Sequence, residues 1–439
     1  MKKIFLSIAS LCFLLQINAQ ETVYPAAAQK GSTVITNATV HVGNGQVIEN
    51  ASVVITNGKI AAVGANVSVP AGATTVNAQG KHVYPGLILP ASNLGLVDVN
   101  SVRATSDARE LGELNPNIRS IVAYNTDSRV INTLRSQGIL LANVVPEGGI
   151  ISGSSSVVQL DAWNWEDAAY KTDAGIHFNM PSLLARPTFG RGGGGAGGPQ
   201  RPATDPVQEG LEQVDRMKMF FKEAQAFAKL DKPEETNLKL AAVKGLFDKK
   251  QKLYVHANTV KQMLVALDFV REFNFDVVIV GGADSWQIAD LLKQNNVSVI
   301  LNQPHSLPML PDDDVDQPYK TPAMLQKAGV TFAINDEDGQ TRGRNLAYNA
   351  GTAATYGLTK EQALQAVTLN AAKVLGIADK TGSIEVGKDA NIVISTGDIL
   401  DMRTSTVTDA FIQGRKIDLT DKQKLLNDRY NRKYGLREF

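Results

Sequence analysis

Histidines and acidic residues follow four short apolar runs in the second half of the chain. Imidazole nitrogens and carboxylate oxygens are the usual donors of a mononuclear zinc site, and manganese accepts the same donor types. The pattern therefore predicts one divalent metal, zinc or manganese. The alternative is that the histidines make ordinary hydrogen bonds, the acids belong to surface loops and no metal is bound. The residues concerned are His256, Asp284, His305, Asp336 and Glu337.

The positions of these residues depend on the secondary structure that precedes each of them. The short apolar runs predict strands, and longer stretches with the spacing of amphipathic helices lie between them. This alternation predicts parallel strands joined by crossover helices, in a barrel or in an open sheet. The predicted strands are 253–256, 276–280, 297–301 and 330–334, and the predicted helices are 260–273, 286–295 and 321–328.

Both ends of the chain have a different pattern, with short β-branched runs between turns. Such runs flank the turn dipeptide Asn57-Gly58, which predicts an antiparallel unit. The same character returns from Ser383 to Ile417. We therefore predict one small β-sandwich domain made from both chain ends. The predicted boundaries are 20–83 and 383–439 for the β-domain and 84–382 for the alternating unit.

Three other patterns could carry chemistry, and each lacks a required feature. The stretch 185–206 is rich in glycine and proline but has no lysine and no flanking strand, so we predict a loop and not a phosphate site. The serines at 154–156 could suggest a nucleophile, but they lack the glycine two residues after the serine that a nucleophile elbow requires. The aspartates at 312–314 lack the glycine and distal glutamate of a calcium loop, which favours a solvated acidic loop.

The composition predicts a globular protein that binds a small molecule or another protein. Of the 439 residues, 43% are apolar, and 44 basic residues balance 44 acidic ones. Without a net charge, no overall field attracts nucleic acid or an anionic membrane. The one cysteine is Cys12. A chain processed after residue 19 would therefore have no disulfide, thiolate zinc site or cysteine nucleophile.

The first residues have the pattern of a secretory signal. Lys2 and Lys3 precede an apolar run over residues 4–15, and Asn18-Ala19 offers a small residue for cleavage. The run is too short to span a membrane, which needs about 20 residues. We expect residues 1–19 to be removed and the protein to be periplasmic or secreted, with no membrane span.

Three stretches resemble the amidohydrolase superfamily, in particular its imidazolonepropionase-like branch. Residues 57–64, NGKIAAVG, are similar to the hairpin of the opening β-domain, and residues 83–88, VYPGLI, to the entry into the first barrel strand. Residues 366–376, AVTLNAAKVLG, with GSIEVGKDA at 382–390, are similar to the segment that leads from the last helix back to the β-domain. The resemblance implies an α/β fold, a (β/α)8 TIM-like barrel with a composite β-sandwich domain.

The resemblance also implies where a metal should be held. Enzymes of this family bind one or two divalent ions at the C-terminal face of the barrel, where the ion lowers the pKa of a bound water. The family's first strand ends in a His-x-His pair, and this chain has Ala91 and Asn93 at those positions. Neither residue replaces an imidazole as a ligand.

The later strands match the family in part. His256 matches the ligand histidine of strand five, whereas glycines and Asp284 stand where strand six normally ends in histidine. Asp336 or Glu337 matches the catalytic aspartate of strand eight, and His305 follows the seventh strand. The other histidines, His41, His82 and His177, have no ligand neighbour at a useful spacing and are interpreted as structural.

Two functions follow from this partial match. The first is a metal-dependent hydrolase of non-peptide C–N bonds, with cyclic amides as substrates, in which His256, His305 and Asp284 bind the metal and Asp336 or Glu337 takes a proton from water. The second is a degenerate homologue that binds a small molecule or pairs with an active paralogue. The family also suggests a homodimer, by analogy alone.

Overall fold

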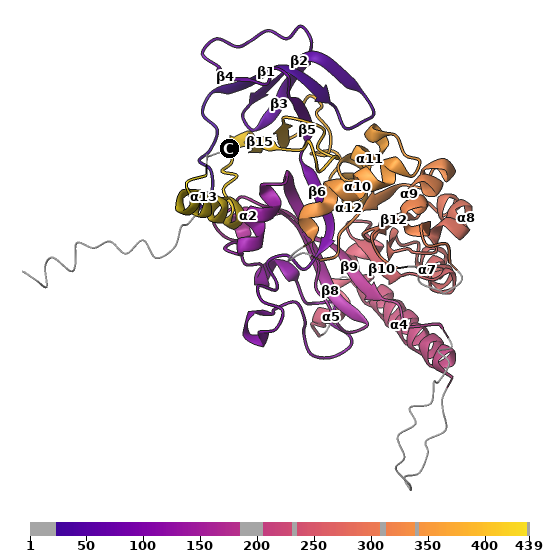
Figure 1. The fold of residues 1–439 in the computed structure, drawn as a ribbon. Coiled ribbons are helices and arrows are strands. Elements are labelled where there is room, and N and C mark those ends of the chain that lie inside the picture. The colour runs from indigo at the N-terminus through magenta and orange to yellow at the C-terminus, as the bar shows by residue number, and fades with distance from the viewer. Residues whose placement is uncertain (1–22, 185–204, 231–234, 308–312, 339–341, 437–439) are drawn as a thin grey trace, which may run out of the picture.

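The computed structural model describes residues 23–184, 205–230, 235–307, 313–338 and 342–436. Two eight-stranded sheets form its framework (Figure 1). The predicted leader and residues 185–204 of the predicted loop lie outside the described residues. No helix of the described part is long and apolar enough to cross a membrane.

The first sheet joins the two ends of the chain in one β-domain. Its strand order is β16-β15-β14-β5-β1-β2-β3, with β4 paired to β1. The tight turn between β2 and β3 is made by Asn57 and Gly58, both with positive φ, as expected for this dipeptide. The strands are β1 (Ser32–His41), β2 (Val47–Thr56), β3 (Lys59–Gly64), β4 (Thr74–Asn77), β5 (His82–Pro85), β14 (Ile392–Ser395), β15 (Val407–Ile412) and β16 (Arg415–Lys416).

The second sheet is the nearly closed barrel. Its strand order is β13-β12-β11-β10-β9-β8-β7-β6. Between β6 and β13, the Asn335 side-chain oxygen accepts a hydrogen bond from the Ala91 amide at 3.1 Å. The strands are β6 (Leu87–Ser92), β7 (Ile139–Val144), β8 (Ile151–Gln159), β9 (Ala169–Asn179), β10 (Lys252–Ala257), β11 (Val277–Gly281), β12 (Ser298–Leu301) and β13 (Phe332–Ile334).

One barrel strand departs from the parallel arrangement of a regular (β/α)8 barrel. β8 is antiparallel to both β7 and β9. The connections on either side of β8 are short, and the second contains only the single-turn helix α3 (Trp165–Ala168). A parallel crossover needs a dozen or more residues, so these connections permit only hairpins.

Helices cover the outside of the barrel mainly on the side of β10 to β13 (Figure 1). α7 begins at a capping box in which Thr259 and Gln262 bond to each other's backbone. α13 lies beside α2, which brings the end of the chain against the barrel. The remaining helices are α2 (Arg129–Arg135), α4 (Pro206–Ala228), α5 (Leu238–Ala242), α6 (Lys244–Phe247), α7 (Val260–Phe273), α8 (Ala289–Gln294), α9 (Gln317–Ala328), α10 (Leu346–Thr355), α11 (Lys360–Ala366), α12 (Leu369–Leu375) and α13 (Lys422–Tyr434).

The N-terminal end of the barrel is filled by α12. Lys252, the first residue of β10, donates from Nζ to the Lys373 carbonyl at 3.1 Å, and the Tyr254 hydroxyl donates to the Val374 carbonyl at 3.3 Å. Apolar side chains of α12 pack in one cluster with interior residues of all eight barrel strands, among them Ile88 and Ile300. The opposite end, where the parallel strands finish, is therefore the place for a site.

Candidate functional site

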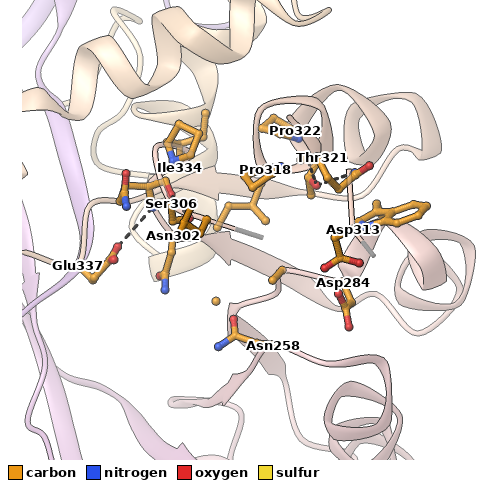
Figure 2. A pocket seen from close by; sticks show the side chains of 18 residues that line it. Asn258, Asp284, Asn302, Ser306, Asp313, Pro318, Thr321, Pro322, Ile334 and Glu337 are labelled. Atoms are coloured by element: carbon orange, nitrogen blue, oxygen red, sulfur yellow. Dashed lines mark hydrogen bonds between the residues drawn. The ribbon is translucent and has the colours of Figure 1, made fainter. Parts of the chain in front are cut away.

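A pocket of about 240 Å³ lies at the carboxyl ends of β10 to β13, with α9 along one side (Figure 2). Apolar side chains such as Leu301, Pro318 and Ile334 form part of its wall. Its polar side chains include Asn258 and Asn302, and the ionisable side chains among the described lining residues are three acids. These acids are Asp284, Asp313 and Glu337.

Asp284 is held at the pocket by the turn that follows β11. Gly281 and Gly282 both have positive φ, and a Cβ on Gly281 would lie 2.3 Å from the Asn258 side-chain oxygen, so only glycine suits this turn. The Asp284 amide donates to the Asn258 carbonyl at 2.9 Å. Asp284 as a whole is 7% exposed, and its carboxylate accepts a 3.4 Å hydrogen bond from the Val260 amide. Burial raises the pKa of Asp284, and the nearby Asp313 carboxylate adds to the increase.

Asp336 and Glu337 follow β13 and have different environments. Asp336 is buried, and its carboxylate accepts bonds from the Asn349 side chain at 3.1 Å and the Asp338 amide at 3.2 Å. Burial is the main cause that raises the pKa of Asp336. The Glu337 side chain is 45% exposed, lines the pocket and accepts a 3.3 Å bond from the Gln303 amide. Glu337 is therefore the acid of this pair that a bound molecule can reach.

His256 is paired with a second histidine inside the barrel. His177 Nδ1 and His256 Nε2 are 2.9 Å apart, with one nitrogen donating to the other. The His177 ring has no exposed surface and stacks on Tyr254, with 4.8 Å between ring centroids. Burial lowers the pKa of both histidines, that of His256 to about 4, so the pair is neutral at neutral pH. Sequence reasoning missed this partner, although His177 lies in a strand-like apolar run.

His305 lies apart from this pair. It is exposed, its Nε2 is 3.1 Å from the Thr352 hydroxyl of α10, and its ring is 5.4 Å from that of Tyr319. It is not among the residues that line the pocket. The structure thus brings Asp284 and Glu337 to one pocket, which Asp336, His256 and His305 do not line.

Comparisons with known proteins agree with this architecture. The amidohydrolase family model matches residues 315–417. Imidazolonepropionase from Mesorhizobium japonicum is 24% identical over 79% of this chain and 87% of its own, and that from Pseudomonas savastanoi is 43% identical over 16% of this chain and 18% of its own. An amidohydrolase structure from Thermotoga maritima is 26% identical, with a TM-score of 0.72, over 88% of this chain and 99% of its own. The chain is similar to amidohydrolases in sequence and in fold over most of its length. Its similarity is to the imidazolonepropionase-like branch.

The positions at which amidohydrolases hold metal have other contacts in this chain. Ala91 packs in the barrel interior, and Asn93 donates to the Glu147 carboxylate at 2.9 Å. His256 is engaged by His177. Among the described residues, no three histidine, cysteine or acidic side chains are grouped so that they could hold a metal ion. The donor set predicted from the sequence is therefore not assembled there, and the residues present do not fit the family's divalent metal.

We expect the purified protein to contain far less than one transition-metal ion per chain. An isolated imidazole with no further donors binds a metal weakly. We therefore expect the content to stay low even after zinc or manganese is added and the protein is dialysed. Elemental analysis of untagged protein prepared without chelator measures this content. Near-stoichiometric metal that is lost in His256→Ala and retained in His305→Ala would contradict the expectation.

The histidine pair should make stability depend on pH below neutrality. The unfolded chain protonates these histidines near the ordinary pKa of 6.5, whereas the folded chain protonates His256 only near about 4. Between these values the unfolded state binds more protons, so the free energy of unfolding falls as the pH is lowered. Chemical denaturation at several pH values in this range should show that the free energy of unfolding changes less steeply with pH in His256→Gln than in the wild type. Val280→Ala, which weakens the same interior without removing a titrating group, should keep the wild-type slope; equal slopes in all three proteins would refute the idea.

Proposed function

We propose that this protein is a hydrolase of non-peptide C–N bonds in small cyclic amides, acting at the pocket beyond β10 to β13 through an altered amidohydrolase site. The observation that carries the proposal is Glu337, an accessible carboxylate on the pocket wall in the turn after the last barrel strand. Similarity to the amidohydrolase family and to imidazolonepropionases supports the substrate class.

Glu337 supplies the acid–base chemistry in this proposal. Its carboxylate takes a proton from a water molecule as the water oxygen bonds to the amide carbon, and it then returns the proton to the ring nitrogen as the C–N bond breaks. The net reaction adds one water and opens the ring to an amino acid. The predicted role of Asp336 becomes one of positioning, because its bond to the Asp338 amide fixes the turn that carries Glu337.

The experiment is a direct test of ring opening. The protein is incubated with a panel of five- and six-membered lactams and cyclic imides, and products are followed by mass spectrometry without added metal. Turnover that is absent from Glu337→Gln supports the proposal. Ligand binding without turnover across the panel would reject it.

A second candidate is a homologue that binds a small molecule without turnover or pairs with an active paralogue. The observation that favours it is the His177–His256 contact together with Ala91 and Asn93 at the ligand positions of strand one. The lactam panel separates the two candidates, because a binding protein would give a calorimetric signal with no product.

The proposed setting is outside the cytoplasm. The signal pattern of residues 1–19 supports export to the periplasm or the medium. N-terminal sequencing of protein from cell fractions tests it: a start near Gln20 in the exported fraction is expected, and an intact Met1 would contradict it. Chromatography with light scattering tests the suggested homodimer.

A further inference from the structure

A polar layer lies inside the barrel, next to the apolar cluster into which α12 packs. Side chains two residues apart along a strand point to the same face of a sheet. Asn143 stands two residues beyond Leu141 of that cluster, and Asn335 two residues beyond Ala333, in both cases towards the C-terminal mouth. The members of the layer come from β7, β8, β9 and the residue after β13, and none of them has exposed surface. They are Asn143, Ser155, His177 and Asn335.

The members from β8 and β9 face the same interior. Ser155 lies two residues before Val157 of the cluster, and because β8 is antiparallel to β7, its first residues lie at the mouth. Ser155 pairs with Gly175, and a Cβ on Gly175 would lie 2.4 Å from the Tyr254 ring, so this face of β9 looks into the barrel. His177, two residues further along β9, stacks on the same ring.

Each member of the polar layer has one side-chain atom that makes no hydrogen bond among the described residues. Asn143 Nδ2 donates to the Pro90 carbonyl at 3.1 Å, so the unsatisfied atom is its oxygen, an acceptor. Asn335 Oδ1 accepts from the Ala91 amide at 3.1 Å, so the unsatisfied atom is its nitrogen, a donor. Because a carbonyl only accepts and a backbone N–H only donates, these partners fix the orientation of both side-chain amides.

The two side-chain amides bind one peptide group of β6, one from β7 and one from the end of β13. The carbonyl that Asn143 contacts and the N–H that Asn335 contacts both belong to the peptide bond between Pro90 and Ala91. Ala91 presents only a methyl group where the family has a histidine, which leaves room at this point of the barrel. A buried polar atom without a partner is unfavourable. An acceptor and a donor that flank one peptide group therefore indicate a ligand with a complementary donor and acceptor.

The polar layer is uncharged, and solvent reaches it. Ser155 and His177 add a hydroxyl and an imidazole nitrogen, both unsatisfied. His256, which is bonded to His177, is partly exposed although its neighbours in β10 are buried, so solvent reaches this part of the barrel. Asp336, next to Asn335, already accepts a hydrogen bond at each carboxylate oxygen. An ionic ligand would therefore find no counter-charge on the layer.

We propose that the polar layer binds a small uncharged amide, whose N–H donates to the Asn143 oxygen and whose carbonyl accepts from the Asn335 nitrogen. The site lies beside Ala91 and His256, which match metal-ligand positions of the family, and it takes an amide in place of an ion. None of the members of the layer lines the pocket of Glu337. The inference therefore goes beyond the proposed hydrolysis and does not depend on it.

Three probes of nearly equal size test this proposal on the full protein near neutral pH. They are acetamide, acetone, which lacks the N–H donor, and acetate, which carries a charge. We expect acetamide to bind about tenfold or more tightly than acetone or acetate, because each of these leaves a buried group of the layer unsatisfied. Ligand-detected NMR titration measures the weak affinities of molecules this small.

Matched variants locate the bound amide. Asn143→Leu and Asn335→Leu keep the approximate size of each side chain and remove its polar atoms, so acetamide should bind about tenfold or more weakly. Glu337→Gln, in the separate pocket, should leave the affinity unchanged. A thermal melt of each sample checks its fold. If the leucine variants do not fold, a crystal structure of the wild type soaked in acetamide locates the probe directly.

Acetamide bound between Asn143 and Asn335, or a preference for acetamide that both leucine variants lose, supports the inference. Equal affinity for the three probes, no binding of acetamide, or ordered water alone at the layer would overturn it. So would an affinity for acetamide that Glu337→Gln abolishes and the leucine variants retain. The lactam panel tests hydrolysis separately, since lactam opening can fail while acetamide binds at the layer.

Discussion

Replacing Asp161 with alanine should lower the free energy of unfolding by about 3–5 kcal/mol, because it leaves buried arginine charge without a partner. The Asp161 side chain has no exposed surface, and the Arg135 side chain that donates to it is 4% exposed. Its second oxygen accepts bonds from Arg415 at 3.0 Å and from the Ala26 amide at 2.9 Å. One carboxylate thus ties together the segment before β1, α2, the segment after β8 and β16.

Urea denaturation measures this loss, and a surface ion pair provides the control. Lys244 and Asp248 form an exposed pair four residues apart. Asp248→Ala should therefore cost no more than about 0.5 kcal/mol. A loss for Asp161→Ala as small as that for the control would show that the buried network does not hold the barrel and β-domain together.

Glu337→Gln should lower kcat for lactam opening by about 10²- to 10⁴-fold with little change in KM. The amide keeps the shape of the carboxylate and can still accept the bond from the Gln303 amide, but it cannot take a proton from water. Steady-state kinetics and a thermal melt of the same sample separate lost chemistry from lost fold.

Asp290→Asn is the matched control for this experiment. It also replaces an exposed acid by its amide, on a helix that does not line the pocket. Its kcat should equal that of the wild type. A Glu337→Gln protein that turns over at the wild-type rate would remove Glu337 from the mechanism and leave the turnover to other groups.

Local sequence determined the elements that depend on neighbouring residues. Asn57 and Gly58 form the predicted hairpin turn because both accept positive φ, and the predicted helix at 260–273 coincides with α7, which its capping box begins at Thr259. The predicted strands at 253–256 and 297–301 agree with β10 and β12 within two residues. The resemblance to the family, and with it the barrel, could also be predicted, because the matching motifs contain Gly58, Gly376 and Gly387. These glycines form turns with positive φ, which few other residues adopt.

Only the tertiary structure decided which polar groups meet. His177 and His256 are 79 positions apart and come together because β9 pairs with β10, with His177 opposite Tyr254, two residues before His256; no spacing along the chain reveals this. His305 instead lies in the loop after β12 and contacts Thr352 and Tyr319, because the direction of a side chain beyond a strand end is set by the loop. Local patterns thus specify turns and helices through short-range contacts, whereas the pocket and the buried Asp161 network depend on long-range packing.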